Sequence, residues 1–479
     1  MVLLAMSSLI LGLVEGSRYY GLKEDAKEFT GLVQESLFAG YQPVLAEDFQ
    51  MFFLDGGFGS GNFNLAAAED EMQALLYDNF ALSGRRDGMN LYRLHMSGIE
   101  ITEYLLASDA DGKVFEMQAA KVMKKIIGQR AARKILDRIK ETEEGKDAKS
   151  PEDSIKDAEA VLAQLSEEKE SKEGEKEQKE LPKTPEPEME NPMETLKKLR
   201  KQGILALVMP AGKAVSEKSA SVDQSLLKRK LNKGVYKKVQ QTGWYERILM
   251  QEFIKPFVGN AVMPKEDGVL SYGTEYLICG RGSDRENLKK TVNQLLLLRE
   301  ASNFLYLQTD KGKNAEAFAA AVAIAGITVN PVIIEAVKQG ILAAWAYVES
   351  ICDVKTLLSG GKVPPMKNPS SWKTQLSNLQ GAVAQDCSKS LSGLSYENYL
   401  DVLLYGKSVK QIAYRSMDLM EWDMQKEYGY ETCKMDHMIV GMKLAAEYEA
   451  NPLFSGIFGK DGGFCYRFAE KASYIYDGT

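Results

Sequence analysis

The sequence contains very little histidine and no closely spaced cysteines, and both shortages exclude common kinds of active site. Among 479 residues there are only two histidines, His95 and His437. Two histidines are too few for a histidine-rich metal site, and they leave little basis for a Ser-His-Asp triad. No Cys-x-x-Cys motif is formed by the five cysteines, which are Cys279, Cys352, Cys387, Cys433 and Cys465. Their odd number excludes complete pairing within the chain, and both one or two disulfides and buried free thiols remain open.

Nucleotide-binding and hydrolase signatures are also missing. The glycine-rich stretch Gly56–Gly61 lies between an expected strand and an expected helix, where phosphate loops occur. It does not fit Gly-x-Gly-x-x-Gly, because Asn62 takes the last glycine place, so we interpret it as a tight turn with positive φ angles. Asp436 and His437 are neighbours on an expected strand and would point to opposite faces. The sequence therefore predicts no enzyme, no cofactor, no metal site and no small-molecule substrate.

Positive charge is nowhere concentrated. The formal net charge is −7, and residues 141–190 alone hold 18 acidic and 8 basic side chains. A nucleic-acid-binding protein normally presents a basic face. The notable basic run is Leu227–Lys230, followed by Lys233, Lys237 and Lys238, and we interpret it as a solvated helix face. We therefore expect no nucleic-acid partner.

The middle of the chain lacks aromatic residues. None occurs between Glu116 and Val235. Within this span, Glu141–Pro192 is a charged, low-complexity segment in which one amphipathic helix is expected, with Ile155, Ala158, Leu162 and Leu165 on its apolar face. The remainder, Ser166–Pro192, has too little apolar surface to offset its ordering entropy and is expected to be a flexible spacer, with an interaction arm as the alternative.

One long apolar run is present, at the start of the chain. Met1–Val14 has no charged residue, and at about 1.5 Å per residue it covers roughly 21 Å of the about 30 Å of a bilayer core. A core helix, a signal peptide and the second half of a membrane helix are the alternatives. A signal peptide needs a basic start, but no Lys or Arg precedes Arg18. A core helix would carry more polar residues than Ser7 and Ser8.

We therefore expect a partial transmembrane helix over residues 1–20, with membrane as a partner. The edge of this anchor is formed by Leu13, Val14, Glu15 and Arg18. The helical pattern continues to Gly40, so the same helix is expected to lead from the membrane into a folded body. Local charges do not fix the orientation.

Two resemblances give this anchor a context. Leu9–Arg18 resembles the membrane-helix edge of the TadE-like minor pilins of tight-adherence (Flp) pili, where an apolar span ends in Glu followed by Gly or Ser and Arg. Three segments, Leu45–Gly59, Gly340–Ser350 and Gly360–Met366, are similar to an uncharacterised family of membrane-anchored proteins of Gram-positive bacteria associated with tight-adherence pilus genes. The resemblance implies a single-pass cell-membrane protein, mostly outside the cytoplasm, with pilus assembly proteins as partners. It implies no chemistry.

Periodicity predicts an α+β fold in which an antiparallel sheet is packed with helices and interrupted by the charged insertion. Expected strands cover 45–54, 90–108, 268–279, 437–448 and 464–476. Expected helices cover 64–80, a single long helix around 117–139, and 283–303, 315–325, 331–357, 396–404 and 409–425.

The early and late strands are expected to share one sheet. The domains are then the anchor (1–20), the two parts of the body (21–140 and 201–479) and the insertion (141–200). The leading hypothesis is a non-enzymatic, membrane-anchored component of a pilus or cell-surface assembly. The alternative is a soluble or secreted enzyme whose first helix is a core element.

Overall fold

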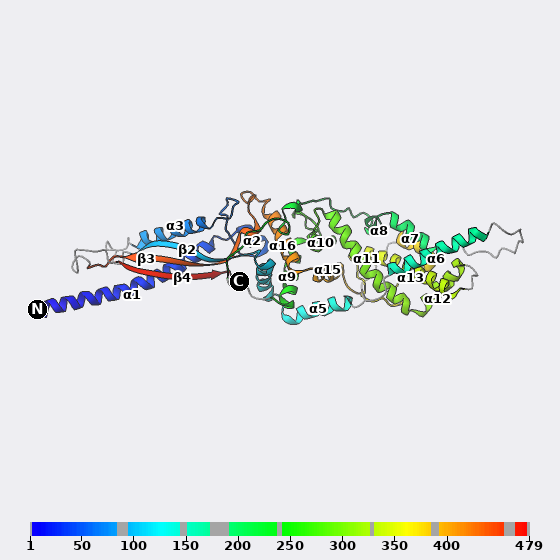
Figure 1. Ribbon diagram of the computed structural model, residues 1–479, viewed down its shortest axis with the longest axis horizontal. Coiled ribbons are helices and arrows are strands. Elements are labelled where there is room, and N and C mark those ends of the chain that lie inside the picture. The colour runs from blue at the N-terminus through cyan, green and yellow to red at the C-terminus, as the bar shows by residue number, and fades with distance from the viewer. Residues whose placement is uncertain are drawn as a thin grey trace. The chain divides into compact units, whose positions relative to one another are not determined.

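The structure is a computed structural model that describes residues 2–83, 94–143, 151–172, 191–236, 242–325, 330–384, 392–454 and 465–476 (Figure 1). The chain divides into two compact units. Unit 1 consists of Met1–Gly128, Asp223–Phe257 and Val409–Thr479, and unit 2 of Gln129–Val222 and Val258–Ser408. Unit 1 is therefore assembled from both ends of the chain and one middle segment.

Helix α1 (Val2–Ala39) opens unit 1, and only its second half is packed against the rest of the unit. The buried positions there recur at three- and four-residue steps, which places them on one helix face. They are Arg18, Leu22, Ala26, Thr30, Val33, Gln34, Leu37 and Phe38. The helix ends immediately before Gly40, as the sequence predicts.

A four-stranded antiparallel sheet receives this face of α1. Its strands are β1 (Leu54–Asp55), β2 (Leu94–Leu106), β3 (Met438–Ala450) and β4 (Tyr466–Ile475). The central strand β3 pairs with β2 along one side and with β1 and β4 along the other. Strands from the beginning and the end of the chain thus share one sheet, and the predicted α+β class is confirmed.

The two faces of the sheet differ in polarity. Alternate residues of β3, such as Leu444 and Tyr448, are buried in a core shared with α1 and α3 (Leu65–Ser83), whereas Glu447 on the opposite face is exposed. Figure 1 shows α1 and α3 running beside the strands. Polar contacts fix the register of α1: Thr30 Oγ1 lies 2.7 Å from the Tyr448 hydroxyl, and Gln34 donates to the Met442 carbonyl at 3.0 Å.

Unit 1 also contains helices outside the α1–sheet core. These are α2 (Pro43–Phe49), the 3₁₀ turn η1 (Ala110–Gly112), α4 (Lys113–Lys124), α9 (Trp244–Val258), α16 (Val409–Met424) and the 3₁₀ turn η5 (Met435–His437).

Among the described residues of unit 2, the regular elements are all helices, joined by irregular loops that carry two isolated bridges. Its long central helix α13 (Pro331–Leu358) is buried over most of its second half and packs against α6, α11 and α12. The other helices are α5 (Gln129–Glu143), α6 (Pro151–Lys172), α7 (Pro192–Lys201), α8 (Ile204–Val208), α10 (Gly273–Cys279), α11 (Asp284–Thr309), α12 (Lys311–Ala325), η4 (Leu376–Asn378), α14 (Leu379–Ala384) and α15 (Tyr396–Tyr405). The 3₁₀ turn η3 (Val222–Gln224) lies where the chain passes from unit 2 to unit 1. Ser283 caps α11, because its side chain accepts the Glu286 N–H.

Three predicted elements are wrong. The segment 45–54 is mostly helix α2, which starts at Pro43 because the Gln42 side chain caps it and proline suits the first turn. The expected helix around 117–139 is broken into α4 and α5 before Gln129. The second half of the expected strand 268–279 forms helix α10, which ends at Gly280, a residue with φ of 62°.

The charged insertion is described only in part. Ile155 and Ala158 are buried on α6, as predicted for an amphipathic helix. The spacer expected over Ser166–Pro192 is helical up to Lys172 and again from Pro192, and its residues 173–190 lie outside the described part of the chain, as does Cys387.

Candidate functional site

The first half of α1, from Val2 to Val14, is an apolar helical segment whose side chains are mostly exposed, and we call it the rod. Eight of its large hydrophobic side chains are between 46% and 81% exposed: Val2, Leu3, Leu4, Met6, Leu9, Ile10, Leu13 and Val14. An 18-residue window of this helix has a mean hydropathy of 1.3, and only 6% of the window is buried. By length and composition α1 can cross a membrane.

The rod meets unit 1 at the predicted anchor edge. Leu13 and Val14 are exposed, but Arg18 is turned toward the body, and its Nη1 donates to Glu15 Oε1 at 2.8 Å. The second oxygen of Glu15 accepts the Leu453 backbone N–H at 3.3 Å. Within about one helical turn, the exposed apolar side chains of Leu13 and Val14 are thus followed by the Glu15–Arg18 ion pair, which is held by the folded unit.

Aromatic rings surround this edge. Tyr19 packs against Tyr466 and Phe468 of β4, with ring centroids 5.3 Å apart in both pairs. Tyr20 is 71% exposed. Tyrosine is enriched where a membrane protein leaves the hydrocarbon layer, because one end of its ring is apolar and the other polar.

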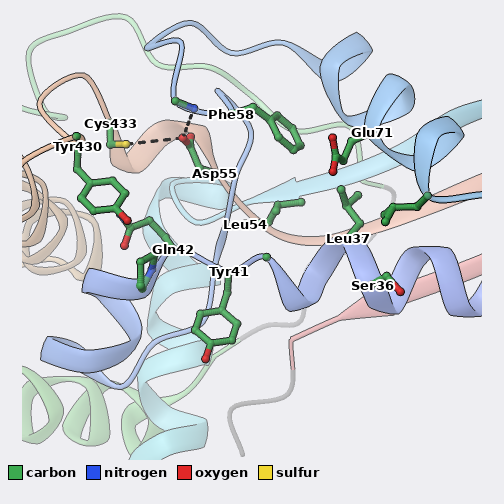
Figure 2. Close-up of a pocket in the computed structure, with 15 residues that line it drawn as sticks. Ser36, Leu37, Tyr41, Gln42, Leu54, Asp55, Phe58, Glu71, Tyr430 and Cys433 are labelled. Carbon is green, nitrogen blue, oxygen red and sulfur yellow. Dashed lines mark hydrogen bonds between the residues drawn. The ribbon is translucent and has the colours of Figure 1, made fainter. Parts of the chain in front are cut away.

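A pocket of about 400 Å³ lies at the other end of α1 (Figure 2). All of its lining residues belong to unit 1. They are Ser36, Leu37, Gly40, Tyr41, Gln42, Pro43, Leu54, Asp55, Phe58, Gly59, Glu71, Leu75, Gly429, Tyr430 and Cys433. The segments that contribute them are the end of α1, the start of α2, strand β1 and the turn after it, helix α3 and the loop after α16.

Asp55 organises one wall of this pocket. Its Oδ1 accepts the Gly57 N–H at 2.9 Å, and its Oδ2 accepts the Gly59 N–H at 3.0 Å. Figure 2 shows Asp55 between this turn and Cys433, whose Sγ lies 3.7 Å from Oδ2. Burial and the nearby carboxylate raise the pKa of the Cys433 thiol to about 12, so the thiol stays protonated and serves as a donor.

Gln42 forms another wall and has an unused donor. Its Oε1 accepts the Leu45 N–H at 3.1 Å and so caps α2. The residue is 3% exposed, and its Nε2 is buried without a hydrogen-bond partner among the described residues. The glycine-rich turn Gly56–Gly61 is confirmed as a tight turn, since Gly59 and Gly61 have φ of 75° and 73°.

The histidines and cysteines form no catalytic arrangement in the described part of the chain. His437 is buried, which lowers its pKa, and its neighbour Asp436 turns away to bind Arg229. His95 is on the exposed face of β2, 3.8 Å from Glu449. No disulfide joins the cysteines of the described residues, which are Cys279, Cys352, Cys433 and Cys465. No group of His, Cys, Asp and Glu suited to a metal ion occurs among the described residues.

Unit 2 contains a buried charge cluster that we define as Arg299, Glu349, Asp353 and Lys367. The Lys367 ammonium lies 2.5 Å from Glu349 Oε1 and 2.6 Å from Asp353 Oδ1. Arg299 lies 3.1 Å from Asp353 Oδ2, and every one of these side chains is at most 1% exposed. The two cations hold the pKa of Asp353 below its usual range, against the effect of burial.

This charge cluster joins a loop to two helices. Lys367 comes from the loop after α13, Glu349 and Asp353 from α13, and Arg299 from α11, where it also donates to the Pro365 carbonyl at 2.8 Å. The opposite charges balance and the group is sealed from solvent, which suits a structural role. Sequence reasoning missed it. The available signal was the pair of acids inside the apolar helix around 331–357.

A second buried ion pair corrects the interpretation of the basic run Leu227–Lys230. This segment is not helical, and Arg229 is not solvated. The Arg229 guanidinium lies 2.5 Å from Glu421 and 2.6 Å from Asp436. Because guanidinium pairs bidentately with carboxylates, it fixes this loop to α16 and η5 within unit 1.

Comparison with known proteins identifies one relationship. A family described as "Family of unknown function (DUF5702)" matches residues 182–450. The match contains the charge cluster of unit 2 and ends with β3, and it does not include α1. No curated protein and no solved structure matches the chain.

Proposed function

Because the chain belongs to the family of unknown function DUF5702, whose description assigns no activity, we propose a function from the exposed half of α1. The protein is a non-enzymatic, single-pass membrane-anchored protein. Its folded body lies outside the cytoplasm and serves as a structural or accessory component of a tight-adherence-type pilus or another cell-surface assembly.

The observation that supports the anchor is the change in burial along one continuous helix. The side chains from Val2 to Val14 have almost no partners in unit 1, whereas the face from Arg18 to Phe38 is packed on the sheet. Fully burying a large apolar side chain is worth about 1.5–3 kcal/mol, so eight exposed ones favour a lipid environment on the order of 10 kcal/mol. A core helix, as in the alternative of a soluble enzyme, would bury these side chains.

The charged edge supports the same placement. Glu15 and Arg18 neutralise each other and are held by the body, so no unpaired charge enters the hydrocarbon layer with the rod. Leu13 and Val14 then lie on the membrane side of the edge. The rod from Val2 to Val14 spans about 20 Å.

The outward placement and the pilus context rest on the resemblance of Leu9–Arg18 to the membrane-helix edge of the TadE-like minor pilins. Treating intact cells with a protease that cannot cross the membrane tests the placement. The proposal predicts that the body is degraded while a cytoplasmic marker survives. Full protection of the body contradicts it.

The pilus role needs a separate test. Deleting the gene in its own host is expected to lower the amount of pilus recovered from the cell surface by shearing, and restoring the gene is expected to reverse the loss. An unchanged amount of sheared pilus contradicts the pilus role and leaves the anchor itself to be judged by fractionation.

A further inference from the structure

The pocket at the end of α1 carries negative charge and no positive charge. Asp55 and Glu71 line it, and none of its fifteen lining residues is Lys, Arg or His. Asp55 already accepts two backbone N–H groups and faces the Cys433 thiol, which leaves about one of the roughly four lone-pair sites of the carboxylate free. A cation that enters this pocket is attracted by the carboxylates of Asp55 and Glu71, which lie on either side of Phe58, and meets no competing cation on the wall.

The same pocket holds a hydrogen-bond donor that the protein leaves unused. The Gln42 amide cannot be reversed without loss, because its Oε1 caps α2 by accepting the Leu45 N–H. Its Nε2 is therefore fixed as the group without a partner among the described residues. A buried donor without an acceptor costs about 1–3 kcal/mol, and a ligand carbonyl would remove this cost.

The remaining wall is apolar and aromatic. Leu37, Leu54 and Leu75 offer aliphatic surface, and Tyr41, Phe58 and Tyr430 offer rings. Figure 2 shows the phenol end of Tyr430 pointing toward Gln42. A volume of about 400 Å³ is within the range of small-ligand pockets. Aromatic faces also attract a cation and its aliphatic stem.

We propose that this pocket binds a lysine residue of a partner polypeptide. Its ammonium group is attracted by Asp55 and Glu71, its stem lies along the leucines, and a backbone carbonyl of the partner accepts from Gln42 Nε2. A lysine matches better than an arginine, because both oxygens of Asp55 are already engaged and cannot receive a bidentate guanidinium fork. The site goes beyond membrane anchoring and does not depend on it.

Calorimetric titration of the full chain in detergent micelles tests this binding with three probes. Nα-acetyl-lysine methylamide supplies the cation, the stem and the carbonyl. Cadaverine lacks the carbonyl, and Nα-acetyl-norleucine methylamide lacks the cation. We expect the lysine amide to bind about fivefold more tightly than cadaverine, and the norleucine amide at least about tenfold more weakly. Equal binding of the lysine and norleucine amides would overturn the proposal, as would no binding of the lysine amide. If cadaverine bound as tightly as the lysine amide or more tightly, the pocket would favour a free diamine over a lysine of a polypeptide, and the proposal would be overturned too.

Matched variants locate the site. Glu71→Gln removes one pocket carboxylate from an exposed position of α3, and Asp70→Asn removes the same charge from the neighbouring residue, which does not line the pocket. Glu71→Gln is expected to weaken both cationic probes about threefold to fivefold, and Asp70→Asn is expected to have little effect. Equal effects of the two variants would overturn the proposed site.

Gln42→Glu separates the two halves of the recognition. Glutamate keeps the oxygen that caps α2 but loses the donor, so the lysine amide is expected to lose its advantage over cadaverine, while cadaverine binds at least as well as before. A retained advantage would show that Gln42 does not recognise the carbonyl. Thermal unfolding of each variant, compared with the parent chain, verifies that the pocket is still folded.

Discussion

Replacing Lys367 by methionine removes the one ammonium shared by Glu349 and Asp353 in the charge cluster of unit 2. Asp353 keeps Arg299 at 3.1 Å, but Glu349 retains only backbone donors, from Lys373 and Thr374. Both acids are 0% exposed, so no water replaces the lost partner. Breaking a buried ion pair from one side costs about 3–5 kcal/mol, and we expect Lys367→Met to lower the free energy of unfolding of unit 2 by this amount.

Tryptophan fluorescence during denaturant unfolding can isolate this effect. Two of the four tryptophans, Trp345 and Trp372, belong to unit 2, and their rings lie 5.7 Å apart beside the cluster. Replacing Trp244 and Trp422 of unit 1 by phenylalanine leaves a signal from unit 2 alone. Lys362→Met, at an exposed position of the same loop, is the control and is expected to change stability by at most about 0.5 kcal/mol.

Two results would refute this reasoning. One is a Lys367→Met effect as small as that of Lys362→Met. The other is a loss of stability that stays the same when Glu349→Gln is added to Lys367→Met. The second change removes the buried negative charge that the first change leaves unpaired, so it should restore part of the free energy of unfolding.

Three further outcomes follow from buried groups in the two units. Burial raises the pKa of Glu275 to about 7, so the folded state keeps a proton that the unfolded state releases above about pH 4.5. The free energy of unfolding should therefore fall by on the order of 3 kcal/mol as the pH rises from about 4.5 to 7. Glu275→Gln should flatten this fall, as measured by denaturant unfolding across this pH range. Arg229→Met should destabilise unit 1 by about 3–5 kcal/mol in denaturant unfolding while the exposed control Lys228→Met stays within about 0.5 kcal/mol, and equal effects would contradict the buried pair. Gly112→Ala should lower the free energy of unfolding by about 1–3 kcal/mol and so lower the melting temperature, because the residue has φ of 82° and a new Cβ would lie 2.6 Å from the Cβ of Ala413. An unchanged melting curve would contradict this.

The sequence predicts the elements with long, regular patterns. Helices α11, α13, α15 and α16 and strands β3 and β4 fall close to their expected positions, because periodicity over ten or more residues is a strong signal. The wrong elements are short or depend on one residue. In α2 the apolar run suits strand and helix equally, and the cap by Gln42 and the proline that follows it decide the outcome.

The candidate site shows the same limit. The exposed anchor can be predicted from composition, since an uncharged apolar run at Met1–Val14 needs no tertiary information. The pocket cannot be predicted, because its walls come from distant parts of the chain. The Gln42 N–H donates to the Phe53 carbonyl at 2.8 Å, and the pairing of β1 with β3 brings the segment of Tyr430 to Asp55. The partners of Arg229 likewise lie about two hundred residues away in the chain, so its charge alone gave the wrong environment.

Membrane fractionation of cells producing the full chain, alongside a variant lacking residues 2–14, tests the anchor most directly. We predict that the full chain stays in the membrane pellet after a high-salt wash and needs detergent for release. The shortened variant should be soluble with an unchanged melting temperature, because the removed side chains contribute little to the folded body. Recovery of the full chain in the soluble fraction without detergent would contradict the anchor.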